Sequence, residues 1–178
     1  MTKANLLSAA DQQRWLVEHL PHRIRSILFG IPMQPPWALV PLRIQVVTMD
    51  ERRTYRCFGN AAWEGRMSAM RWLIMFVGLK YDSNKGHAVE YTISKPTDVR
   101  IDALQGGKLF SPSQVGADTL GRMWDGCSKA TSHPTNNTNH FPVDELHLAE
   151  ALQLIIDHLD ATVYRQHGRS LHNCTLGS

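Results

Sequence analysis

Apolar residues recur every three or four positions over two long segments of the chain, 48–77 and 143–164. That spacing places them on one face of an α-helix. The first stripe consists of Trp63, Met67, Met70, Ile74 and Val77. The second stripe consists of Leu148, Leu152, Ile155, Leu159 and Val163, and it is widened by Leu146, Ala149 and Ile156. The pattern predicts two long amphipathic helices that pack against other helices.

Capping sequences predict where the helices begin. A serine or threonine followed three residues later by an acidic residue or glutamine can satisfy the free amides of a first helical turn. Three such pairs occur: Ser8 with Asp11, Thr48 with Glu51, and Ser111 with Gln114, the last with Pro112 at the first helical position. We expect helices from Ser8, from Thr48 to about Val77, and from Ser111 to about Lys129.

Prolines and glycines predict the interruptions. Pro21 should kink or restart the first helix because it has no amide to donate, and Gly30 and Gly78 should end the first and second helices. Four prolines within 32–41 predict an extended connector. The following segment, 42–47, is β-branched but short, and we expect it to be irregular or a strand.

The segment 80–110 has a different, alternating pattern that is typical of strands. Its alternating residues are Val89, Tyr91 and Ile93 and, after a turn at 95–98, Val99 and Ile101. We expect a small β-hairpin or an extended arm here. The chain is thus predicted to be one all-α domain over 1–178, a bundle of four or five helices with this hairpin or arm inserted after the long helix.

The breadth of the second stripe predicts association between copies. A surface helix usually needs a single apolar stripe to pack on its own domain. Residues 143–164 offer more apolar surface than that, which we interpret as more than one small protomer can bury. We therefore expect a homodimer, and a protein partner is a further candidate for covering this surface.

Composition and charge exclude some classes of protein. The 178 residues have a formal net charge of only +3, too small to indicate nucleic-acid binding by itself. The start has no apolar run typical of a signal peptide, and the most apolar stretch, 72–79, is too short to span a membrane. With no secretion signal, the three cysteines predict reduced thiols and a cytoplasmic protein; they are Cys57, Cys127 and Cys174.

The charges are unevenly distributed. Residues 1–71 contain ten Lys or Arg against five Asp or Glu, whereas 141–164 contain acidic residues and no Lys or Arg. Arg52, Arg53, Arg56 and Arg66 are the candidates for binding an anion or nucleic acid, since aromatic residues are interleaved with arginines at the start of this helix. The alternative is structural pairing of these arginines with the acidic last helix.

Glu64 and a group of histidines are the candidates for chemistry. Glu64 lies mid-helix near the first stripe, where a carboxylate can be a general base with a raised pKa or a structural partner of an arginine. Zinc ligands are commonly histidine and cysteine, and the weak metal candidates are Cys127, His133, His140 and His147. His133 and His140 are equally explained as loop residues and Cys127 as a buried apolar residue, so we expect no cofactor.

The order of elements over 48–164, with Ser132-His133-Pro134 to His140 between the last two helices, resembles the helical bundle of HEPN proteins (higher eukaryotes and prokaryotes nucleotide-binding). Active members have an Arg-x4–6-His motif at this junction and act as dimeric, metal-independent RNases. No arginine lies four to six residues before His133 or His140, and the fit from Arg165 to His172 lies in the C-terminal tail. The resemblance with this departure implies a non-catalytic relative.

Common catalytic motifs are missing from the sequence, among them the nucleophile elbow, the dinucleotide-binding turn and the zinc-protease helix. We therefore expect a dimeric, non-catalytic binding or interaction protein. One alternative is an RNA-acting or hydrolytic bundle that uses Glu64, the arginines and the histidines His133 and His140. The other is a metal-binding bundle.

Overall fold

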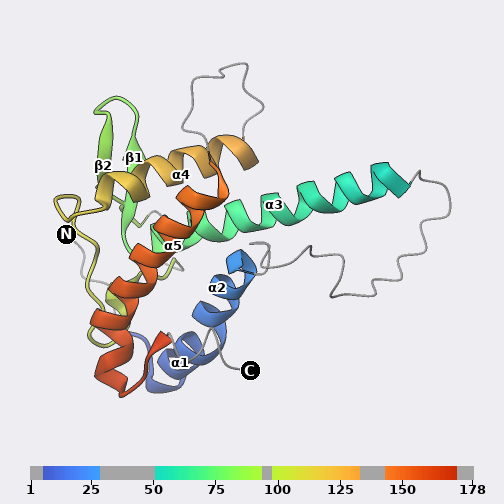
Figure 1. The fold of residues 1–178 in the computed structure, drawn as a ribbon. Coiled ribbons are helices and arrows are strands. Elements are labelled where there is room, and N and C mark those ends of the chain that lie inside the picture. Colours follow the sequence, from blue (N-terminus) through green and yellow to red (C-terminus); the bar gives the residue numbers. More distant parts are fainter. Residues whose placement is uncertain (1–5, 29–50, 94–97, 133–142, 172–178) are drawn as a thin grey trace.

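The computed structural model describes residues 6–28, 51–93, 98–132 and 143–171, with the backbone alone described in 51–61 and 130–132. Its helices and strands follow in chain order (Figure 1): α1 Ala9–Arg14, a π-helical turn Trp15–His19, α2 Leu20–Leu28, α3 Glu51–Phe76, β1 Leu79–Asp82, β2 His87–Glu90, a 3-10 turn Ile101–Ala103, α4 Ala117–Ser132, α5 Glu145–Leu159, a second π-helical turn Asp160–Tyr164 and a 3-10 turn Arg165–His167. The predicted helical bundle with an inserted hairpin is confirmed.

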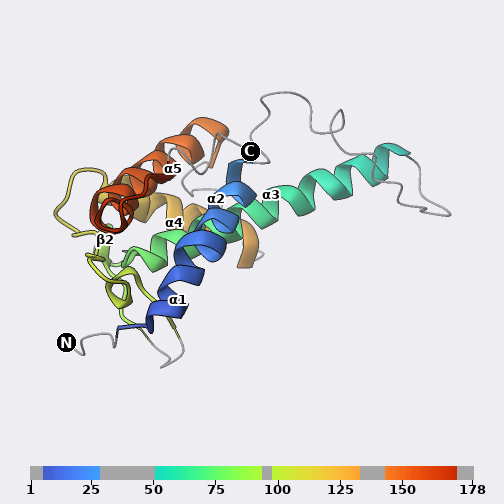
Figure 2. The same ribbon diagram turned by 90° about the horizontal axis from the view of Figure 1, so that it is seen from below.

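The C-terminal half of α3 lies at the centre of the bundle. It packs against α2 on one side and α4 on another, and α5 contacts both α3 and α4. The antiparallel hairpin of β1 and β2 packs on α4. The first turns of α3 project beyond the other helices in both views (Figures 1 and 2).

The predicted helix starts and stops are confirmed at two places. The side chain of Ser8 accepts the amide of Asp11 at the start of α1, as the capping pair predicts. The helix α3 ends at Phe76, and Gly78 has a φ of +97°, which a residue with a side chain adopts only with strain. Thr48, the predicted cap of α3, and Gly30, the predicted stop of the first helix, lie outside the described residues.

Pro21 produces a π-helical turn instead of a break. In a regular α-helix the Leu16 carbonyl would accept the amide of Leu20, but that amide donates to the Trp15 carbonyl. Pro21, the next residue, has no amide to offer. The hydroxyl of Tyr164 donates to the Leu16 carbonyl instead, at 2.8 Å. The last helix thus satisfies a carbonyl that the proline leaves without a backbone donor.

The hairpin is shorter and lies earlier than predicted. Leu79 pairs with Glu90 and Asp82 with His87, whereas Ile93 and Val99 lie outside the described strands and Ile101 begins a 3-10 turn. The turn at 83–86 explains the register, because the Asp82 carboxylate accepts the amide of Asn84 at 3.0 Å and Gly86 has a φ of +73°. The prediction placed the turn at 95–98 and overlooked the Asp-Ser-Asn-Lys-Gly sequence of 82–86, which is the feature that should have placed it.

The helix α4 begins at Ala117, six residues after the predicted start at Ser111. The Ser111 hydroxyl does accept a local amide, that of Ser113 at 3.3 Å, but Gly116 then has a φ of +88°, which interrupts any helix started earlier. Once begun, α4 is fixed to the hairpin by Asp118, whose carboxylate accepts the amide of Ala88 at 3.2 Å.

Both apolar stripes are buried within one protomer. Met70, Leu148 and Ile155 are each 0% exposed, and Trp63 is partly buried. The exposed large apolar residues of the described part are scattered over different elements; they are Leu6, Val17, Val115 and Leu146. The central residues of both stripes therefore need no second copy to cover them, whereas Leu146 and Ala149, which widen the second stripe, are exposed. The buried stripes do not by themselves support the predicted homodimer, which stays a prediction.

The predicted connector at 32–41, the segment 42–47 and the histidines His133 and His140 lie outside the described residues. Within the described ranges, the helices lack the combination of length and apolarity that crossing a membrane would require.

Candidate ligand-binding site

Three aromatic rings stack where the N-terminal helix meets the end of α3. Trp72 and Phe76 lie four residues apart on α3 and so share one face, and Trp15 reaches them from the π-helical turn. The ring centroids are 5.6 Å apart for Trp15 and Trp72, 5.2 Å for Trp15 and Phe76, and 5.3 Å for Trp72 and Phe76, with interplanar angles of 8–13°. All three rings therefore have nearly the same orientation. We call them the aromatic stack.

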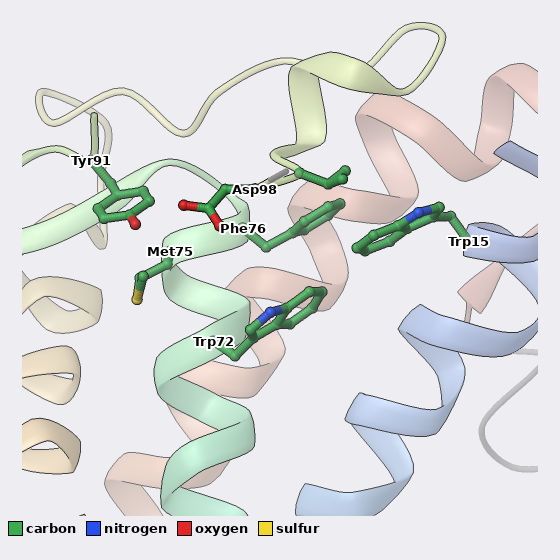
Figure 3. Close-up of a pocket in the computed structure, with 7 residues that line it drawn as sticks. Trp15, Trp72, Met75, Phe76, Tyr91 and Asp98 are labelled. Carbon is green, nitrogen blue, oxygen red and sulfur yellow. The ribbon is translucent and has the colours of Figure 1, made fainter. Parts of the chain in front are cut away.

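The aromatic stack forms one side of a pocket of about 280 Å³. This volume lies just below the range of about 300–1,000 Å³ for small-molecule sites. Figure 3 shows the rings with the other side chains around the cavity. The lining consists of Trp15, Trp72, Met75, Phe76, Tyr91, Asp98 and Val99. Phe76 is buried, whereas the rings of Trp15 and Trp72 remain partly exposed. Aromatic surface that the bundle does not cover thus faces a cavity.

Backbone bonds place Tyr91 at the pocket. Its amide donates to the Gly78 carbonyl at 2.8 Å, just beyond the end of α3. Its carbonyl accepts Nη1 of Arg100 at 2.8 Å. Arg100 is buried and is also bound by Asp102, at 2.7 Å, and by Glu90, at 3.4 Å. The hydrogen bond with Asp102 is the main cause that raises the pKa of Arg100 above its ordinary value. Arg100 is thus a fixed structural cation beside the pocket.

Asp98 supplies the one acidic group among the described residues of the pocket lining. Its side chain is partly buried, and in Figure 3 its carboxylate lies between the rings of Tyr91 and Phe76. Across the four described ranges, no hydrogen bond or ion pair joins this carboxylate to another residue. Arg100, two residues on, is engaged by Asp102 and Glu90. The pocket therefore combines flat apolar walls with one uncommitted acceptor.

Two basic side chains of the N-terminal helix accompany the aromatic stack. The guanidinium of Arg23 lies over the ring of Trp72, 5.1 Å from its centroid, and the His19 ring lies 5.2 Å from that of Trp15 at an angle of 56°. Both residues are exposed. Each covers part of one tryptophan ring. The two tryptophans also line the cavity.

Arg66, a candidate for binding anions, is bound within the protein. It is only 4% exposed, and its Nη1 and Nη2 donate to the two carboxylate oxygens of Glu145 at 2.7 and 2.5 Å. Its Nε donates to the Ile27 carbonyl at 3.1 Å, and the guanidinium lies over the Trp63 ring. Glu145 opens α5, so at Arg66 the alternative of pairing with the acidic last helix holds.

Arg52, Arg53 and Arg56 lie on the projecting first turns of α3, where side chains are not described. Arg71, further along α3, lies over the ring of Trp124 on α4, 5.4 Å from its centroid. Glu64 is exposed. The hypothesis that it is a general base relied on burial to raise the pKa of its carboxyl group, and an exposed side chain does not fit that hypothesis.

Two of the metal candidates, Cys127 and His147, lie in the described residues, and each contacts groups other than a metal-ligand set. Cys127 is buried, with its Sγ 3.6 Å from Sδ of Met67 and 3.7 Å from Sδ of Met123, and burial raises the pKa of its thiol to about 12. His147 lies in the first turn of α5, where its Nδ1 is 2.8 Å from the capping carboxylate of Asp144. In the described ranges, no three His, Cys, Asp or Glu side chains form a group suited to a metal ion.

Sequence reasoning missed the pocket because its walls come from distant segments. Trp72 and Phe76 at a spacing of four, with Trp15 in another helix, were visible as aromatic residues. Their convergence depends on how the N-terminal helices pack against α3, which no local pattern predicted. Comparison of the chain with protein-family models, curated proteins and solved structures finds no match. The site is therefore interpreted from its own geometry.

Proposed function

We propose that this protein is a non-catalytic binding protein that holds a small, flat ligand in the pocket beside the aromatic stack. The observation that supports the proposal is the cavity itself, with partly exposed rings of Trp15 and Trp72 on one side. Aromatic rings lose water-exposed surface when a flat molecule stacks on them, and offset stacking adds a favourable contribution. The lining residues that the structure describes include no Ser, Cys, Lys or His, and their single carboxylate has no partner base among them.

The test is binding of indole, a small flat probe, measured by saturation-transfer NMR with the full chain. Small rigid ligands of this size reach affinities of about millimolar or better in a good apolar site. The variant Val99→Phe adds a ring to the lining and should abolish the transfer. Val115→Phe adds the same ring at a position that is 91% exposed and should leave it unchanged. Binding that survives Val99→Phe, or no binding to the unaltered chain, would reject the proposal.

Homodimerisation also belongs to this proposal, although the apolar stripes do not support it. Light scattering at micromolar concentration tests it directly, with a monomer mass as the contrary result. The RNA-acting and metal-binding alternatives stay predictions, as does a cytoplasmic location. No observation in the described part of the chain favours either alternative, so we develop neither of them further.

A further inference from the structure

The orientation of the rings and the state of Asp98 together restrict the chemistry of the ligand. This inference rests on the proposed binding role and asks what kind of molecule the pocket selects.

The ring orientation favours a flat ligand over a spherical one. Cages for methylated ammonium groups surround the cation with aromatic faces, so that several ring quadrupoles point at one centre. Here Trp15, Trp72 and Phe76 are within 13° of parallel. A further ring parallel to these three would repeat their spacing of 5.2–5.6 Å, which is within the range of offset-stacked aromatic pairs.

Asp98 requires a ligand that donates hydrogen bonds. A partly buried carboxylate among aromatic side chains loses water without a compensating bond. The neighbouring Arg100 does not supply one in the described structure, where four of its five N–H donors go to Asp102, Glu90 and the Tyr91 carbonyl. A carboxylate has two oxygens and accepts two adjacent N–H groups in the fork geometry that it also uses with arginine.

We propose that the pocket selects a flat nitrogen heterocycle, stacked parallel to the rings of Trp15, Trp72 and Phe76, whose adjacent N–H groups donate to the carboxylate of Asp98. The rings supply affinity that depends little on the identity of the heterocycle. Asp98 supplies discrimination, because it distinguishes a ligand edge with donors from an edge of the same shape without them. Asp98 is thus the specificity-determining residue of the site.

Two probes of equal size and shape test this. 2-Aminobenzimidazole presents an amino group and a ring N–H side by side, whereas 2-methylbenzimidazole replaces the amino group with a methyl group. Calorimetric titration of the full chain should give a dissociation constant at least about tenfold lower for the amino compound, which is the discrimination typical of hydrogen bonds to a charged acceptor. Tetramethylammonium, a spherical cation, should not bind.

Two matched variants distinguish the binding of a flat ligand from the discrimination that we assign to Asp98. Asp98→Ala should remove the difference between the probes while retaining the binding of 2-methylbenzimidazole. Glu150→Ala, which removes an exposed acid on α5, should leave the difference intact. Equal affinity of the two probes for the unaltered chain would overturn the role of Asp98 and leave the binding proposal standing. Preference for tetramethylammonium would overturn the ligand class, and a failure of all three probes to bind would overturn both proposals.

Discussion

Two places in this bundle combine an arginine, a tryptophan and a carboxylate, and they use them in opposite ways. At the first, Arg66 lies 5.1 Å from the Trp63 ring centroid, is almost fully buried, and is bound by Glu145 and the Ile27 carbonyl. At the second, Arg23 lies at the same distance from the Trp72 ring but is exposed. The carboxylate at this second place is Asp98, which lines the same pocket as Trp72 and has no hydrogen bond or ion pair among the described residues.

The difference between the two places shows that the residue types present do not by themselves identify a binding site. At Arg66 every charged group has a partner. Arg66, Trp63 and Glu145 therefore join α2, α3 and α5 and leave no charged group available to a ligand. In the second, aromatic surface and an acceptor remain available beside a cavity. Uncommitted polar groups, more than clustered charges, indicate where this protein can bind something.

The largest effect is expected from breaking the paired junction. Glu145→Ala leaves the guanidinium of Arg66 buried without its carboxylate, and we expect the free energy of unfolding to fall by about 2–3 kcal/mol. This value lies below the range of about 3–5 kcal/mol for fully buried pairs because the Glu145 side chain is 45% exposed. Urea denaturation measures the change. Glu150→Ala on the same helix is the control, with a change within about 0.5 kcal/mol, and a similarly small change for Glu145→Ala would contradict the assigned role.

A smaller effect is expected from Tyr164, whose hydroxyl binds the backbone next to Trp15 of the pocket. Tyr164→Phe removes the donor to the Leu16 carbonyl, and an unsatisfied buried carbonyl costs about 1–2 kcal/mol. Since Leu16 follows Trp15, the same variant should also weaken indole binding. In a Pro21→Ala background an amide becomes available to this carbonyl, so Tyr164→Phe should cost less there. Additive effects in this double-mutant cycle would show that the hydroxyl and the proline act independently.

A pH-dependent effect is expected from His158 on α5. Its Nε2–H donates to the Lys108 carbonyl at 2.7 Å, its ring lies against Phe110, and desolvation lowers its pKa below the ordinary value of 6.5. Protonation therefore favours the unfolded chain, so stability is full above about pH 6.5 and falls as the pH decreases below it. Denaturation midpoints over this interval should depend less on pH in His158→Gln. His87→Gln, at an exposed histidine, should keep the full dependence.

Asp160 provides a check on that assignment because it acts in a different pH interval. Burial alone would raise the pKa of its carboxyl group. Hydrogen bonds from the Leu171 amide, Ser170 and Arg165 outweigh burial and hold the pKa below its ordinary value of 3.8. Its contribution is complete above about pH 4 and is lost only as the pH falls further. A loss of stability between pH 6.5 and 5 that persists in His158→Gln would have to come from another group.

The smallest effect is expected at Asp98. Because its carboxylate makes no hydrogen bond or ion pair in the described part of the molecule, Asp98→Ala should change the free energy of unfolding by no more than about 0.5 kcal/mol. A loss of more than about 1 kcal/mol in thermal or urea unfolding would show that the carboxylate has a structural partner. The contrast with Glu145→Ala would then disappear.

The parts of the fold that depend on local patterns could be predicted from the sequence. The apolar spacing from Met67 to Val77 and from Leu148 to Val163 gave the buried faces of α3 and α5, and the Ser8 cap gave the start of α1. The errors arose where a glycine outweighed a favourable local signal. Gly116 delays α4 despite the Ser-Pro-Ser-Gln sequence, and the turn ending at Gly86 moves the hairpin.

The candidate site depended on information that local patterns do not contain. Whether Arg66 is available or paired depends on Glu145, 79 residues away in the sequence. Whether Trp15 reaches Trp72 depends on how the helix passes Pro21. The breadth of the apolar surface on α5 was visible, but the number of neighbours that cover it within one chain was not. Pairing over long separations is set by the tertiary fold, which spacing alone cannot reveal.

The hydrogen bond between Tyr164 and Leu16 spans 148 positions of the chain. During synthesis the π-helical turn Trp15–His19 is made long before Tyr164, so the Leu16 carbonyl lacks this donor until the residues after α5 have been added. Trp15, the first residue of that turn, therefore has its position secured only after every lining residue of the pocket has been made. One wall of the pocket thus depends on a residue that follows all the others that form it.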